Sequence, residues 1–71
     1  MPIEVGAHIT GTVFKIEVSV GTQVNPGDTL VILESMKMEM PVEAPTRGTI
    51  TEIKVREGQS VQEGEALIVL D

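Results

Sequence analysis

Apolar and polar residues alternate along two stretches of the chain that lie 37 residues apart. The first stretch covers residues 11–20, and its apolar set is Phe14, Ile16, Val18 and Val20. The second stretch is less apolar, and its corresponding set is Thr51, Ile53 and Val55. Charged or small polar residues fill the intervening positions. A period of two residues is typical of a half-buried strand, so we expect two strands with these sets facing the core.

Downstream of each stretch, apolar residues and glycines recur at every third position, a spacing that imitates a helix. Glycine fills every second of these positions and Pro26 lies within the first run, and both residues disfavour a helix interior. We therefore expect a turn, a short strand, a turn and a second strand in each run. The turns would contain Gly21, Gly27, Gly58 and Gly64. The final strands would be Leu30–Leu33 and Leu67–Leu70, whose continuous apolar character is typical of burial on both faces.

These patterns belong to an internal duplication. Residues 7–34 align with residues 44–71 without a gap, and ten of the 28 aligned pairs are identical. Because two copies are too few for a solenoid, we expect them to pack against each other about a pseudo-two-fold axis, which makes residues 1–71 a single domain. The short connection between the copies then forms a tight hairpin. Symmetry places this hairpin, with Lys37, opposite the chain termini.

Composition excludes several classes of function. The 71 residues carry a formal charge of -6, which repels nucleic-acid phosphates and anionic membranes. No apolar run approaches the roughly 18 residues of a membrane span, and the first residues do not resemble a signal peptide. The chain has no cysteine, which is compatible with a reducing compartment. We therefore expect a cytoplasmic protein that binds neither nucleic acid nor membranes.

The connection between the copies contains the candidate chemistry. Three of the four methionines fall at positions 36, 38 and 40, around Lys37, and methionine is an adaptable contact residue for another protein. Without that context, a lysine at a hairpin tip is an ordinary surface residue. With His8 as the single histidine and no cysteine, catalytic triads, thiol nucleophiles and metal sites lack members. We predict no catalytic residue and no metal ligand.

The segment Glu34-Ser35-Met36-Lys37-Met38-Glu39 resembles the attachment motif of the biotin/lipoyl attachment family, in which Met-Lys-Met is the signature. That family also consists of two quasi-repeats with the modified lysine on the hairpin between them. The resemblance implies an all-β barrel-sandwich hybrid of two four-stranded antiparallel sheets. It also implies biotin on Lys37, attached by a biotin protein ligase. The motif residues implied to contact the ligase are Glu34, Ser35, Met36, Met38 and Glu39.

The same resemblance implies a non-catalytic carrier of a biotin-dependent carboxylase. Biotin on Lys37 would carry an activated carboxyl group from a biotin carboxylase to a carboxyltransferase, on an arm of roughly 15 Å. The chain is similar to biotin carboxyl carriers that lack a thumb insertion and to small stand-alone attachment proteins. It departs from many biotinyl domains at Ala7-His8-Ile9, where Ala-Pro-Met is common.

Three alternatives remain at this point. A lipoyl carrier, or one that accepts both groups, would share the fold, but lipoyl domains usually have aspartate at the position of Met36. A β scaffold without modification would act as an interaction module. An enzyme that uses Lys37 as a Schiff-base nucleophile ranks last, because a hairpin tip offers no apolar pocket to depress the lysine pKa.

Overall fold

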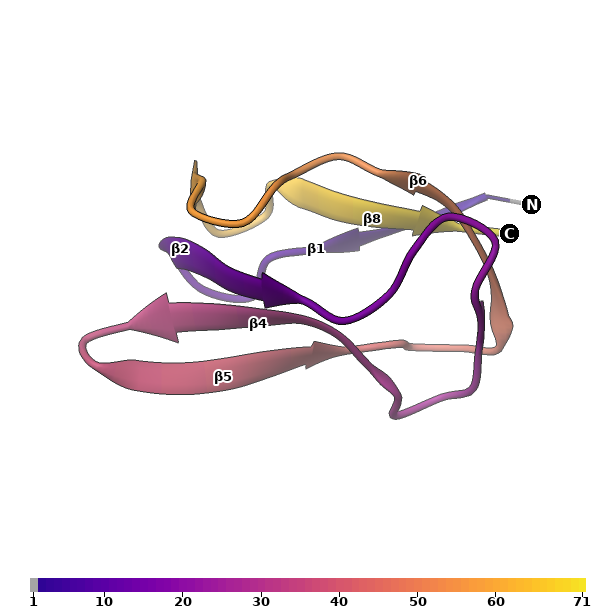
Figure 1. Ribbon diagram of the computed structural model, residues 1–71, viewed down its shortest axis with the longest axis horizontal. Coiled ribbons are helices and arrows are strands. Elements are labelled where there is room, and N and C mark those ends of the chain that lie inside the picture. The colour runs from indigo at the N-terminus through magenta and orange to yellow at the C-terminus, as the bar shows by residue number, and fades with distance from the viewer. Residues whose placement is uncertain (1) are drawn as a thin grey trace.

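The computed structural model describes residues 2–71, which form two four-stranded antiparallel sheets (Figure 1). This is the expected all-β architecture. One sheet has the strand order β1-β8-β6-β3 and the other has the order β5-β4-β2-β7. The strands are β1 (Ile3–Gly6), β2 (Gly11–Ile16), β3 (Gln23–Val24), β4 (Thr29–Ser35), β5 (Met38–Glu43), β6 (Gly48–Ile53), β7 (Ser60–Val61) and β8 (Ala66–Leu70).

Each strand of the first half has a counterpart about 37 residues further along the chain. Strands β1, β2, β3 and β4 correspond to β5, β6, β7 and β8, and exchanging each strand for its counterpart converts one sheet order into the other. The correspondence begins at β1, which is earlier than the alignment of residues 7–34 suggests. It leaves residues 36–37 as the segment between the two sets of strands.

The expected inward faces of β2 and β6 are partly wrong. In β2, Val13 is buried at 1% exposure, whereas Phe14 is 48% exposed. A β-bulge between Val13 and Lys15 inserts Phe14 as an extra residue opposite β4, so the alternation breaks there. The same irregularity lies between Ile50 and Glu52 in β6, where Ile50 is buried. The extra residue there, Thr51, is exposed instead of facing the core.

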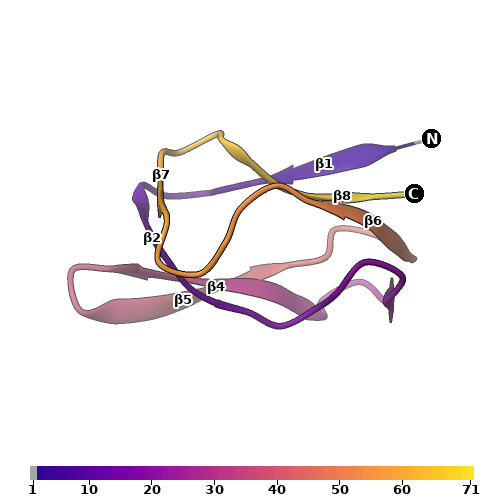
Figure 2. The same ribbon diagram turned by 45° about the horizontal axis from the view of Figure 1, so that its top comes forward.

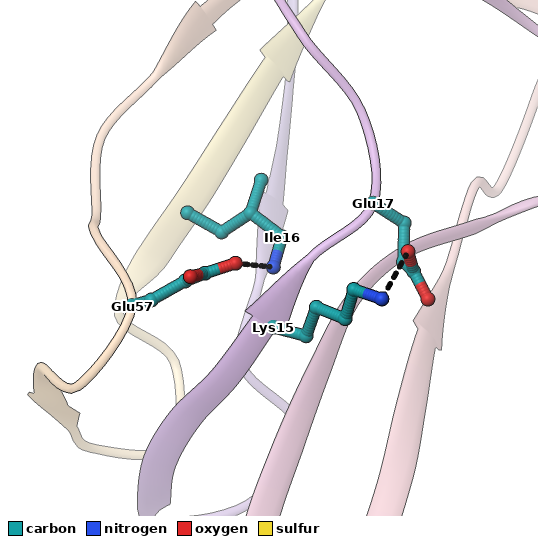
Figure 3. A network of polar contacts seen from close by, with 4 residues as sticks. All are labelled: Lys15, Ile16, Glu17 and Glu57. Carbon is teal, nitrogen blue, oxygen red and sulfur yellow. Dashed lines mark hydrogen bonds and ion pairs between the residues drawn. The ribbon is translucent and has the colours of Figure 1, made fainter.

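The first predicted strand is also too long. Strand β2 ends at Ile16, and the chain beyond it forms a loop in which Val20 is 63% exposed. Ile16 and Val18 are partly buried and pack against the core, as expected. The strand ends where Glu57, from the opposite loop, accepts a hydrogen bond from the Ile16 backbone N–H at 3.1 Å (Figure 3). Ile16 pairs with Val31 of β4 but lies beyond the residues that pair with β7, and this bond satisfies its backbone donor.

The two apolar runs form the centre of the core. Strands β4 and β8 each lie between two neighbours in their sheet. Leu30, Leu33, Leu67 and Ile68 are each fully buried, and only Ile32 within the two runs is partly exposed. Register shifts lie next to Leu30 and Leu67, where each strand buries consecutive residues. The expected burial of these runs is therefore largely confirmed.

Turns between the short strands contain the four glycines that the sequence places there. All four have positive φ, from 89° to 97°, a conformation that costs glycine far less than other residues. Side chains close the turns in matching ways: Asp28 accepts from the Asn25 N–H at 2.8 Å, and Glu65 accepts from the Gln62 N–H at 3.0 Å. The turn prediction is confirmed.

The molecule is elongated, with principal extents of 33 × 18 × 17 Å. The turn between β4 and β5 lies at one end, and the two chain ends lie together at the other (Figure 1, Figure 2). The hairpin is therefore opposite the termini, as the symmetry argument predicts. Across residues 2–71 there is no helix long and apolar enough to cross a membrane.

Candidate attachment site at the β4–β5 turn

Two residues, Met36 and Lys37, form the whole turn between β4 and β5. Ser35 and Met38 are the last paired residues of the two strands. Both turn residues have positive φ, 53° for Met36 and 64° for Lys37. Two consecutive residues with positive φ are the signature of a type I′ turn, whose twist matches the right-handed twist of the flanking strands. The tight hairpin that the sequence predicts is present.

The backbone of this turn is strained, because both of its residues carry a side chain in the left-handed region. Asparagine and glycine are the usual residues of a type I′ turn, because other residues pay about 1–2 kcal/mol each in the left-handed region. Among the described non-glycine residues, Met36 and Lys37 alone have positive φ. Strain of this kind persists only where the surrounding structure determines the conformation, and it is concentrated at functional sites.

The strands hold the base of the turn firmly. Six residue pairs join β4 to β5, and Leu33 is completely buried beneath the hairpin. On the other side of β4, the backbone of Gly11 approaches so closely that a Cβ there would lie 2.6 Å from the carbonyl oxygen of Glu34. A glycine is therefore required where β2 supports the hairpin. The Gly-Thr that opens each copy marks this position, but sequence alone does not reveal the contact.

Lys37 is exposed at the tip, as expected. It has no hydrogen-bond or ion-pair partner within residues 2–71. Met36 and Met38 on either side are 92% and 61% exposed, whereas Met40 is partly buried at the base of the hairpin. The site therefore presents a primary amine between two solvent-exposed thioether side chains. Within residues 2–71, no pocket of the kind that a Schiff-base enzyme needs encloses the amine. The amine is accessible for acylation.

The remaining motif residues flank the tip on the two arms of the hairpin. Glu34 and Glu39 are exposed and lie directly opposite each other across β4 and β5. Two like charges in this position repel each other by a few tenths of a kcal/mol. Ser35 is partly buried beside the turn. His8 is exposed in the segment between β1 and β2 and does not belong to the motif.

No group of three or more histidine, aspartate or glutamate side chains in residues 2–71 is placed to hold a metal ion. The exposed amine of Lys37 suits a covalently attached organic group. An exposed amine without a charged partner fits such a group, because acylation removes the ammonium charge without breaking an interaction.

Comparisons with known proteins agree with this geometry. A family model described as "Biotin-requiring enzyme" (Biotin_lipoyl) matches residues 1–70. The biotinylated protein TB7.3 homolog of Mycobacterium leprae is 52% identical over 44 residues, which are 62% of this chain and 62% of that protein. Pyruvate carboxylase of Bacillus subtilis is 50% identical over 44 residues, 62% of this chain but 4% of that protein. These matches thus span less than two thirds of either relative.

Solved carboxylase structures contain the same fold. The urea carboxylase of Kluyveromyces lactis matches 100% of this chain with a TM-score of 0.94 and 31% identity, over 6% of its own length. A single-chain, multi-domain long-chain acyl-CoA carboxylase matches 97% of this chain with a TM-score of 0.92 and 32% identity, over 7% of its length. The chain therefore belongs to the biotin/lipoyl attachment family.

Proposed function

We propose that Lys37 is the residue that carries biotin. The observation that supports this most strongly is the turn itself: Lys37 occupies one of its two positions, exposed and strained, at the end of the molecule farthest from the chain termini. A group attached there extends away from the domain. A partner enzyme can then receive it without contact with the termini, where a longer chain would continue.

The other two lysines are placed differently. Lys15 lies in β2 with its Nζ 3.8 Å from Glu17, and Lys54 follows β6 with its Nζ 3.8 Å from Glu52. Such exposed pairs contribute little to stability, but each puts a carboxylate beside the lysine ammonium. Lys37 alone combines a turn position with an amine that has no such partner among residues 2–71.

Attachment forms an amide between the lysine Nζ and the carboxyl carbon of an activated biotin. The bond from that carbon to the activating group breaks, and Nζ releases a proton. A biotin protein ligase would bind the motif through Glu34, Ser35, Met36, Met38 and Glu39. The exposed methionines offer adaptable apolar contacts, and the two opposed carboxylates offer a site for a basic residue of the ligase.

In the carrier cycle, this domain moves between active sites and performs no chemistry itself. When bound, biotin supplies a nitrogen that accepts and releases an activated carboxyl group. We propose a biotin carboxylase and a carboxyltransferase as the partners, in agreement with the carboxylases that contain the related domains. The lack of cysteine and the net charge of -6 support a cytoplasmic location without nucleic-acid or membrane partners.

Single lysine substitutions test the attachment site. The variants Lys15→Arg, Lys37→Arg and Lys54→Arg keep the charge and are each co-expressed with a biotin protein ligase. We expect streptavidin to label the wild type, Lys15→Arg and Lys54→Arg equally and to leave Lys37→Arg unlabelled. Thermal unfolding of all three variants should match the wild type, because none of these side chains contributes to the core. Undiminished labelling of Lys37→Arg would reject the assignment.

A further inference from the structure

An apolar stripe crosses the outer face of the sheet that ends in the hairpin. It consists of Phe14 on β2, Ile32 on β4 and Pro41 on β5. Ile32 pairs with Pro41 on one side and with Lys15, the neighbour of Phe14, on the other. Phe14 is 48% exposed, Pro41 is exposed and Ile32 is partly exposed. Phe14 is the single aromatic residue of the chain, and the bulge in β2 turns it outward.

The duplicated fold accepts polar residues at two of the three positions of this stripe. The counterparts of Phe14, Ile32 and Pro41, 37 residues away, are Thr51, Val69 and Glu4. Thr51 and Glu4 are exposed and polar, and the Thr51 hydroxyl donates a hydrogen bond to the carbonyl of Val69 at 3.3 Å. The same bulge in the same architecture therefore accepts threonine. An exposed phenylalanine at the equivalent position requires another explanation, and large exposed apolar side chains that cluster indicate a binding surface.

The charges around the stripe indicate what binds there. Glu43 lies beyond Pro41 on β5, and the opposed pair Glu34 and Glu39 lies on the side nearer the turn. On the same face, Lys15 of β2 points toward Glu17, with its Nζ 3.8 Å from the carboxylate (Figure 3). An apolar stripe with acidic residues on both sides complements an apolar side chain flanked by lysine or arginine. The same charges oppose a second copy of this domain, which would bring its own carboxylates.

We propose that this stripe docks a catalytic component of the carboxylase, through an apolar side chain of that component set between basic residues. The identity of the partner rests on the proposed carrier function. Pro41 is four residues from Lys37, about 14 Å along an antiparallel strand. When a catalytic component receives the group on Lys37 in its active site, the surface around its active-site entrance therefore lies against the stripe of this domain.

The test uses Phe14→Thr, which installs the residue found at the counterpart position, and Thr51→Ser as the matched control on the other sheet. Each biotinylated domain serves as free substrate for the purified biotin carboxylase and carboxyltransferase components. For at least one component, we expect Phe14→Thr to raise the KM for the carrier about tenfold with kcat nearly unchanged, which is the size of effect of a buried aromatic anchor. Thr51→Ser should change neither constant, and thermal unfolding of both variants should match the wild type.

Binding without biotin separates this proposal from the attachment site. In a Lys37→Arg background, isothermal titration should still detect binding of the domain to the same component, and Phe14→Thr should weaken it. Glu43→Gln, which leaves the stripe intact, should reduce the dependence of that binding on salt. If Phe14→Thr leaves both the KM and the binding unchanged for both components, the docking surface is rejected. That outcome leaves the role of Lys37 unaffected.

Discussion

The strained turn yields a prediction with an internal control, the comparison of Met36→Gly with Met38→Gly. Both side chains are methionines that are mostly exposed, so neither substitution removes much packing. Met36 has a φ of 53°, whereas Met38 is the first residue of β5 and has no positive φ. The two substitutions therefore differ chiefly in backbone conformation, and their effects on stability should have opposite signs.

The magnitude follows from two opposing contributions at Met36. Glycine relieves a left-handed penalty of about 1–2 kcal/mol but costs about 0.5–1 kcal/mol in chain entropy. The net stabilisation is about 0.5–1 kcal/mol, and for a domain of this size each kcal/mol corresponds to roughly 4–8 °C in Tm. At Met38 only the entropic cost remains. We expect Met36→Gly to raise Tm by about 2–8 °C and Met38→Gly to lower it by a similar amount.

Differential scanning calorimetry of the unmodified proteins measures both effects under identical conditions. A Tm for Met36→Gly that falls as far as that for Met38→Gly would refute the argument that the turn stores backbone strain. A biotinylation assay on the same proteins shows what the strained residue contributes. If the ligase contacts Met36, the more stable variant should be labelled more slowly than the wild type.

Three further substitutions test the support of the hairpin. Gly11→Ala should lower the free energy of unfolding by about 1–3 kcal/mol in urea titration, because its Cβ would lie 2.6 Å from the Glu34 carbonyl oxygen. Gly6→Ala is the control. Its Cβ would meet nothing nearer than 3.4 Å, so its free energy of unfolding should stay near that of the wild type. Leu33→Ala should lower the free energy of unfolding by about 2–5 kcal/mol, which is much of the roughly 4–10 kcal/mol expected for a chain of this length. A loss below about 1 kcal/mol would contradict the burial of Leu33 in the core. Glu39→Gln should stabilise the domain by a few tenths of a kcal/mol at low salt, because it removes the repulsion with Glu34, and should slow labelling by the ligase; faster labelling would contradict the proposed contact.

The sequence predicted the elements better than their inward faces. Strict alternation predicts that Phe14 and Thr51 face the core. This prediction is wrong because each strand contains a β-bulge, which depends on pairing with β4 or β8 and leaves no local signature in the sequence. The duplication does contain a clue. Positions 13 and 50 hold valine and isoleucine, whereas positions 14 and 51 hold phenylalanine and threonine. The pair that stays apolar in both copies is the one that the structure buries.

The candidate site was predictable in position but not in conformation. The short connection between the copies and the residues around Lys37 are enough to predict an exposed lysine on a tight hairpin. A type I′ turn is not readable there, because Met36 and Lys37 replace the asparagine and glycine that usually indicate it. The close approach of Gly11 to Glu34 was likewise hidden, since it joins residues 23 positions apart through strand packing.

Intact mass with peptide mapping shows whether Lys37 alone receives biotin. The domain is co-expressed with a biotin protein ligase in one culture and with a lipoyl ligase in another. We predict a mass increase of one biotinyl group in the first culture, located on the peptide that contains Lys37, and no lipoyl group in the second. A lipoyl group without biotin, or biotin on Lys15 or Lys54, would show that Lys37 is not the biotin site.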